Sequence, residues 1–155
     1  MTIKAFSRLG MITKLKYVGV AIEDLLDIYV LYIRSVLEYC AVVWHSGLTQ
    51  DQINSLERVQ KTCLKVILGD NHVSYSAALE MCSLETLFER RETRCLSFVK
   101  KCLKHPVHNR MFPLNENNEH ISREKYVVNF ARTDAYKMSA IPYLQIRLNN
   151  EKTMH

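Results

Sequence analysis

The sequence predicts an all-α fold, and three observations support this prediction. Apolar residues recur every three or four positions along several long segments, which is the period of one helix face. The 155 residues include only four glycines and three prolines, too few for the many turns of an all-β protein. Hydrophobic residues make up 48% of the chain, enough to fill one core. We therefore expect a small antiparallel helical bundle at residues 1–105, with an irregular, partly loose C-terminal third, residues 106–155, packing on it.

Two helices are predicted in the first third of the chain. The first and weaker one covers Ile3–Tyr17, and the second, Asp24–Trp44, has the clearest pattern. Asp24 and Asp27 lie in the first turn of the second helix, where the helix dipole favours carboxylates. The apolar stripe of this helix is continuous and consists of Tyr29, Ile33, Val36, Leu37, Cys40 and Trp44.

Helix-start and helix-stop signals place the next elements. Thr49 and Gln52 have the spacing of a capping box, and Gly69 can take the left-handed backbone that ends a helix. A short helix is predicted around Ser76–Met81, and Ser83 is predicted to cap a long helix from Leu84 to about Lys104. The predicted buried stripe of the long helix consists of Leu87, Phe88, Cys95, Phe98, Val99 and Cys102.

Beyond His105 the pattern weakens. Pro106, Pro113 and the polar run at 115–120 predict loop. The segment 126–131 favours β structure but has no partner strand. A brief helix is predicted from Ser139 through Leu148, and residues 149–155 are predicted to fray.

Composition excludes several classes of protein. No apolar run approaches the roughly 20 residues of a membrane-spanning helix, and no secretory signal is visible, so we expect no membrane partner. The number of cysteines is odd, five, without a CxxC pair, which indicates reduced thiols in the cytoplasm or nucleus. A net charge of +5 permits an anionic partner.

Four segments carry a family pattern: IRSVLEYCAVVW at 33–44, LERVQKTCLKVILG at 56–69, LETLFERR at 84–91, and the run REKYVVNFARTDAYKMSAIPYLQIRLNN at 123–150. This order resembles the post-polymerase, thumb-adjacent region of LINE-type non-LTR retrotransposon reverse transcriptases, jockey-like elements among them. The resemblance covers about Leu9 to Asn149. It implies a fragment of an RNA-directed DNA polymerase that lies outside the polymerising part.

The residues needed for catalysis are missing. A reverse transcriptase centre needs clustered aspartates to hold two metal ions. This chain has no adjacent pair among its aspartates, which are Asp24, Asp27, Asp51, Asp70 and Asp134. We therefore predict no catalytic residues, no cofactor and no polymerase activity of the chain alone.

Zinc binding is the alternative for Cys95, Cys102, His105 and His108. Residues seven apart on a helix are separated by about 10.5 Å, whereas zinc binds thiolates at about 2.3 Å. We therefore interpret these residues as two core cysteines and two histidines near a helix C-terminus, and predict no metal site.

The predicted nucleic-acid-binding residues are basic and lie on two helix faces. They are Arg58, Lys61, Lys65, Arg90, Arg94, Lys101 and Lys104. Lysines and arginines at this spacing can follow a phosphate backbone of RNA or an RNA–DNA hybrid, in support of template–primer or ribonucleoprotein binding. Two alternatives remain. One is a merely solvated helix face, and the other is a helical protein-interaction module without nucleic-acid affinity, completed by another chain or by the missing polymerase portion of the same polyprotein.

Aromatic residues and one arginine complete the candidates. Trp44, Tyr29, Tyr32 and Tyr39 can stack on bases, but their helical spacing favours a place in the core. Arg91 falls at the edge of an apolar stripe, which predicts a partly buried, structural arginine paired with a glutamate or with helix-end carbonyls.

Overall fold

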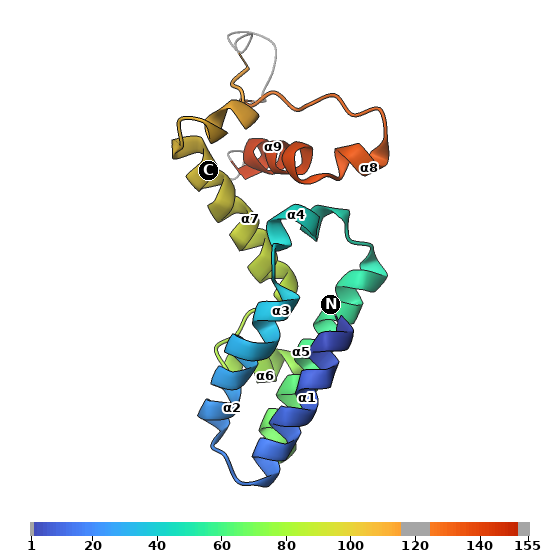
Figure 1. The fold of residues 1–155 in the computed structure, drawn as a ribbon, viewed down its shortest axis with the longest axis vertical. Coiled ribbons are helices and arrows are strands. Elements are labelled where there is room, and N and C mark those ends of the chain that lie inside the picture. The colour runs from blue at the N-terminus through green and yellow to red at the C-terminus, as the bar shows by residue number, and fades with distance from the viewer. Residues whose placement is uncertain (1, 116–124, 152–155) are drawn as a thin grey trace. The chain divides into compact units, whose positions relative to one another are not determined.

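The computed structural model describes residues 2–115 and 125–151, and these form an all-α fold in which no strand occurs (Figure 1). The predicted fold class is therefore confirmed. The chain forms two compact units: unit 1 is Met1–Tyr39 with Thr49–Arg90, and unit 2 is Cys40–Leu48 with Arg91–His155. The predicted domain boundary after residue 105 falls inside unit 2. No helix in the described ranges is both long enough and apolar enough to cross a membrane.

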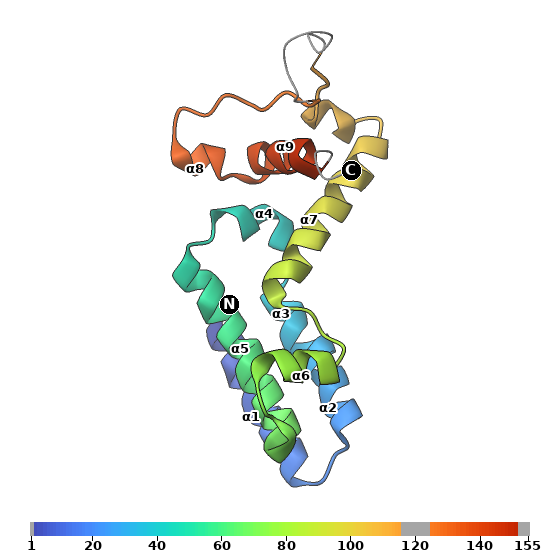
Figure 2. The ribbon, with the colours of Figure 1, turned by 180° about the vertical axis from the view of Figure 1, so that it is seen from behind.

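Unit 1 is built on two long helices that lie side by side. These are α1 (Thr2–Tyr17) and α5 (Gln50–Leu68), and α6 (Tyr75–Met81) packs on α5, as Figure 2 shows from behind. The capping box at the start of α5 is present: Thr49 Oγ1 accepts from the Gln52 backbone, and Gln52 Oε1 accepts from the Thr49 backbone. The predicted helices at 3–17, after Thr49 and around 76–81 are thus confirmed.

Gly69 ends α5 with a positive φ of 57°. A Cβ at this position would lie 2.5 Å from Lys16 Nζ. That ammonium group donates to the carbonyls of Val66, at 2.6 Å, and Ile67, at 2.9 Å, so a lysine of α1 satisfies the free carbonyls at the end of α5.

The prediction of one continuous helix over Asp24–Trp44 is wrong. The chain forms α2 (Ile22–Ile28), a π-helix η1 (Tyr29–Arg34), α3 (Ser35–Leu37) and, after a break, α4 (Ala41–Trp44). At the break Cys40 takes a left-handed backbone with φ 51°, which an α-helix interior does not accept.

The π segment explains which side chains of this region are buried. Leu25, Tyr29, Ile33 and Leu37 are buried and stand four apart. In an α-helix a spacing of four drifts by about 40° per step. The wider i→i+5 turn of η1 reverses part of this drift, so all four side chains stay on one face.

The last long helix also begins later than predicted. α7 spans Leu87–Lys104, and its cap is Thr86, not Ser83. Thr86 Oγ1 accepts from the Glu89 backbone at 3.2 Å, and Glu89 Oε2 accepts from the Thr86 backbone at 3.3 Å. Ser83 instead occupies a turn with φ 52°. The predicted burial of Phe88 and Phe98 is wrong, since both are exposed.

Unit 2 contains α4, the 3₁₀ turn η2 (His45–Gly47), most of α7, and three further elements: η4 (His108–Met111), α8 (Asp134–Lys137) and α9 (Ala140–Glu151). Its core consists of Cys95, Val99, Cys102, Phe112, Tyr126, Leu144 and Leu148. α9 confirms the helix predicted from Ser139.

The fraying predicted for 149–155 is wrong for Asn149. Its side chain accepts from the Tyr126 backbone N–H at 2.9 Å and donates to the Tyr126 carbonyl at 3.0 Å. Among the residues described, the β pairing of the segment 126–131 is limited to one isolated bridge, between Tyr126 and Leu114. The predictions for 116–120 and 152–155 lie outside the described residues.

Candidate nucleic-acid interface and the buried polar clusters

The basic residues of α5 lie on its solvent-facing side. Arg58, Lys61 and Lys65 are all exposed. The opposite side of the helix is buried and consists of Leu56, Val59, Gln60, Cys63, Leu64, Ile67 and Leu68. Lys61 Nζ also lies 4.9 Å from the ring centroid of Tyr75, the first residue of α6, and this contact restrains the lysine side chain.

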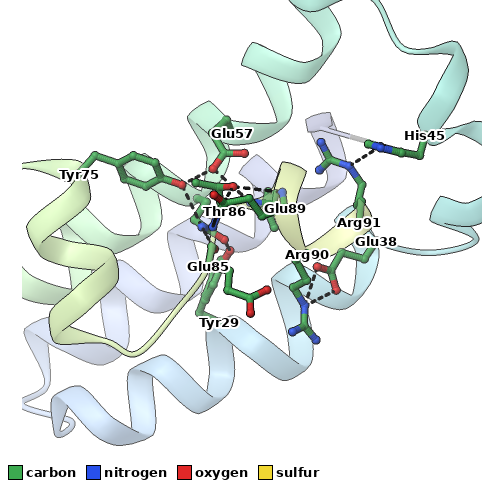
Figure 3. Close-up of polar contacts among 12 residues, drawn as sticks. Tyr29, Glu38, His45, Glu57, Tyr75, Glu85, Thr86, Glu89, Arg90 and Arg91 are labelled. Carbon is green, nitrogen blue, oxygen red and sulfur yellow. Dashed lines mark hydrogen bonds and ion pairs between the residues drawn. The ribbon is translucent and has the colours of Figure 1, made fainter. Parts of the chain in front are cut away.

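Arg90 differs from the exposed cations because it pairs with a buried carboxylate. Its Nε lies 2.8 Å from Oε1 and 3.2 Å from Oε2 of Glu38, whose side chain is 2% exposed (Figure 3). A buried carboxylate without a compensating charge is costly, so Arg90 stabilises unit 1. Arg90, which the sequence predicted as a phosphate contact, is thus engaged in an ion pair within unit 1.

In unit 2, α7 presents Arg94, Lys101 and Lys104 to solvent. Lys101 and Lys104 lie in the last helical turn, where the dipole favours positive charge. Lys100 is on the same helix, and its Nζ pairs with Glu151 at 2.6 Å.

A polar cluster that the sequence analysis did not identify lies in the interior of unit 1. Gln60 is 0% exposed, and its amide is fully bonded: Oε1 accepts from the Tyr29 hydroxyl at 2.5 Å, and Nε2 donates to the Tyr75 hydroxyl and the Glu85 carbonyl, each at 2.9 Å. Burial raises the pKa of the Tyr29 phenol, which stays a neutral donor. One signal was present in the sequence, since Gln60 is the polar member of an otherwise apolar helix face.

Glu57 extends this cluster to the start of α7 (Figure 3). Its Oε1 accepts from the Tyr75 hydroxyl and, at 3.2 Å, from the Leu87 backbone N–H. Because the first N–H groups of a helix lack intrahelical partners, the Glu57 carboxylate completes the N-terminus of α7.

A second cluster joins three segments of unit 2. His45 Nε2 lies 2.7 Å from Glu92 Oε1, which also accepts from the Tyr143 hydroxyl, while Glu92 Oε2 accepts from Arg147. Burial lowers the pKa of His45. Burial by itself would raise the pKa of Glu92, but the hydrogen bonds from Tyr143 and His45 and the positive charge of Arg147 together lower it. The neutral ring of His45 therefore donates through Nε2.

Arg91 lies at the other nitrogen of this histidine. It is 0% exposed, its Nε donates to His45 Nδ1 at 3.3 Å, and its guanidinium lies 5.9 Å from the Trp44 ring centroid (Figure 3). The sequence predicted a partly buried arginine paired with a glutamate or with helix-end carbonyls. The structure buries Arg91 completely, and its Nε donates to a histidine ring instead.

This cluster resembles the base and orienting acid of a catalytic triad, but its geometry does not serve catalysis. The His45 ring is buried, and both of its nitrogens are bonded, to Glu92 and Arg91. A general base must reach the proton of a substrate or nucleophile. We therefore interpret the cluster as a structural link among η2, α7 and α9.

The cysteines and histidines considered as zinc ligands have other roles. Cys95 and Cys102 are core residues, and burial raises the pKa of Cys95 to about 11. His105 Nδ1 accepts from the backbone of Val107 and His108, and the rings of His105 and His108 stack at 4.1 Å. Within residues 2–115 and 125–151, no three His, Cys, Asp or Glu side chains gather where they could hold a metal.

The aromatic residues divide between core and surface. Tyr29 is buried and Trp44 is half-buried, but Tyr32 and Tyr39 are 45% and 72% exposed, so the core prediction is wrong for these two. The reason is the four-residue spacing of the buried face, which turns Tyr32 outward, and the break after α3, which leaves Tyr39 outside the helix.

Comparisons with protein-family models, with curated proteins and with solved structures found no match to this chain.

Proposed function

We propose that this chain is a non-catalytic part of a LINE-type reverse transcriptase that supports template–primer or ribonucleoprotein binding through phosphate contacts. The contacts come from two groups of exposed cations. These are the α5 face (Arg58, Lys61 and Lys65) and the α7 face (Arg94, Lys101 and Lys104).

The observation that carries this proposal is the exposure of all six side chains on helices whose opposite faces are buried. Substituting such residues leaves the core intact, and their spacing along a helix suits a repeating phosphate backbone. A polymerase role for the chain itself has no such support: its five aspartates are exposed and lie far apart in sequence, apart from Asp24 and Asp27, which both belong to α2.

The test is binding of a labelled RNA–DNA hybrid, measured by fluorescence anisotropy at salt concentrations from about 50 to 200 mM. Each phosphate contact contributes about 0.9 to the slope of log affinity against log salt for a duplex. Triple glutamine variants of the α5 face and of the α7 face should each lower that slope by about two to three. Circular dichroism checks that each variant stays folded.

A matched control removes the same charge elsewhere. Arg110, Arg132 and Lys137 are exposed and belong to neither face, so their triple glutamine variant should change the slope by less than about one. Wild-type protein that does not bind the hybrid, or binds it without salt dependence, would refute the proposal. Equal slopes for all three variants would reject these two faces.

The second candidate is a helical interaction module that binds the missing polymerase portion of the same polyprotein. Large apolar side chains that are exposed in unit 1, such as Leu31 and Tyr17, favour it because such surfaces mark interaction sites. This candidate predicts that the polymerase portion binds with little dependence on salt while the hybrid does not bind. Replacing Leu31 by serine should then weaken the protein complex.

A further inference from the structure

A groove in unit 1 lies between α1 and the segment from Ser35 to Tyr39, which contains α3. It encloses about 520 Å³ and is lined by Lys4, Arg8, Ser35, Val36 and Tyr39. None of the five is acidic and two are basic, so the groove favours an anion. The groove shares no residue with the α5 face or the α7 face.

Arg8 is held in place at one side of this groove. Its guanidinium lies 4.1 Å from the ring centroid of Tyr32, and its Nη1 donates to the Tyr32 carbonyl at 2.6 Å. This bond uses one of the five N–H donors of a guanidinium group. Lys4 lies one helical turn earlier on α1 and is exposed, so two positive charges border the same space.

Tyr39 adds an aromatic surface to these charges. Its side chain is 72% exposed, although a large aromatic ring is ordinarily covered where a core is available. Val36 lies beside it in the groove and is partly buried, which provides an apolar floor. Ser35 Oγ donates to the Leu31 carbonyl at 2.7 Å, so its oxygen can only accept a hydrogen bond from a ligand.

We propose that this groove is a subsite for single-stranded nucleic acid, in which Lys4 and Arg8 contact a phosphate and Tyr39 stacks on an adjacent base. Cations beside an exposed ring are the combination that single-strand binders use, since every base has a face that can stack. A duplex cannot use the ring, because its bases are already stacked on one another. An acidic peptide would account for the cations but not for the exposed ring.

This inference rests on the proposed function and adds a second mode of binding to it. The basic faces contact phosphates of a duplex, whereas the groove takes an unpaired strand. Lys4 and Arg8 lie outside the set of basic residues that the sequence predicted, whereas Tyr39 is one of the tyrosines whose sequence positions were compatible with base stacking.

The experiment measures binding of a deoxythymidine strand of about 12 nucleotides, a typical site size for such proteins, and of an abasic strand with the same number of phosphates. The wild-type protein should bind the deoxythymidine strand about tenfold more tightly than the abasic strand. Tyr39→Leu should abolish this preference, while Tyr39→Phe, which keeps the ring, should retain it. Lys4→Gln should weaken the binding of both strands equally.

The outcomes separate the two proposals. If Tyr39→Leu binds the deoxythymidine strand as tightly as wild type while the hybrid still binds the basic faces, the groove proposal is overturned and the proposed function survives. If neither strand nor the hybrid binds, both are overturned. If an oligoglutamate peptide binds through Lys4 and the deoxythymidine strand does not, the groove is a protein-binding site. Circular dichroism of Tyr39→Leu and Lys4→Gln confirms that the fold is retained.

Discussion

Replacing Gln60 by leucine tests whether the buried polar cluster stabilises unit 1. The amide of Gln60 is the acceptor for the Tyr29 hydroxyl and the donor to the Tyr75 hydroxyl and the Glu85 carbonyl. Leucine has nearly the same volume, so the substitution removes these bonds without opening a large cavity. The effect therefore reports on the hydrogen bonds.

The three partners of Gln60 are affected differently. The Tyr75 hydroxyl keeps its bond to Glu57, and the Glu85 carbonyl belongs to an exposed residue and can turn to water. The Tyr29 hydroxyl belongs to a fully buried residue and is left without an acceptor. A buried polar group left without a partner costs about 1–3 kcal/mol, so we expect Gln60→Leu to lower the free energy of unfolding by about that amount.

A double-mutant cycle isolates the contribution of the hydrogen bond between Tyr29 and Gln60. Tyr29→Phe alone leaves the Gln60 oxygen without its donor and should also cost about 1–3 kcal/mol. In the double variant neither orphaned group remains, so its cost should fall at least about 1 kcal/mol below the sum of the single costs.

Urea unfolding followed by far-UV circular dichroism measures all four proteins, with the slope of the transition checked for constancy. Costs that add to within about 0.5 kcal/mol would show that the two groups act independently. The reasoning that the Tyr29–Gln60 bond organises this core would then be refuted.

Three further predictions concern charge and backbone. Burial lowers the pKa of His45 from its ordinary 6.5. The stability that this residue contributes is therefore complete above pH 6.5 and is lost as the pH falls through the lowered pKa. Thermal melts at several pH values should show this loss, and His45→Asn should remove the share of the pH dependence that comes from His45. Arg90→Gln removes a positive charge that pairs with the buried Glu38 carboxylate and should lower the unfolding free energy by about 2–3 kcal/mol. Lys101→Gln, at an exposed site, should change it by less than about 0.5 kcal/mol. Equal urea midpoints for the two variants would contradict the structural role of Arg90. Gly69→Ala places a methyl group close to the Lys16 ammonium at a backbone position with positive φ, and it should lower the free energy of unfolding by about 1–3 kcal/mol. Gly10→Ala, at an open position of α1, should be neutral or stabilising. Melting temperatures that fall equally in the two variants would contradict this contrast.

The sequence predicted correctly those features that depend on residues a few positions apart. The capping box of Thr49 and Gln52 was visible because its two residues bond each other three positions apart. The basic faces of α5 and α7 were visible for the same reason, since a helix places residues three and four apart on one side. Exposure of these cations follows from burial of the opposite face, which the apolar period also predicts.

The sequence did not predict features that depend on contacts between residues far apart along the chain. Nothing near Glu38 indicates that its carboxylate turns inward, because its partner Arg90 is 52 positions away. His45 and Glu92 are likewise 47 positions apart, so the sequence around either residue does not indicate that the two form a cluster. Such pairs form only after the helices have packed.

The sequence by itself determined the all-α class, the caps of α5 and which side of α5 faces water, because each depends on spacing along a helix. Only the tertiary structure decided where the predicted Asp24–Trp44 helix breaks and which tyrosines are exposed. In that region the π turn determines which side chains share the buried face, and the left-handed Cys40 interrupts the helix before α4; no glycine or proline marks either feature. The groove of Lys4, Arg8 and Tyr39 is lined by α1 and by a segment distant from it in sequence, so local pattern could not have revealed it.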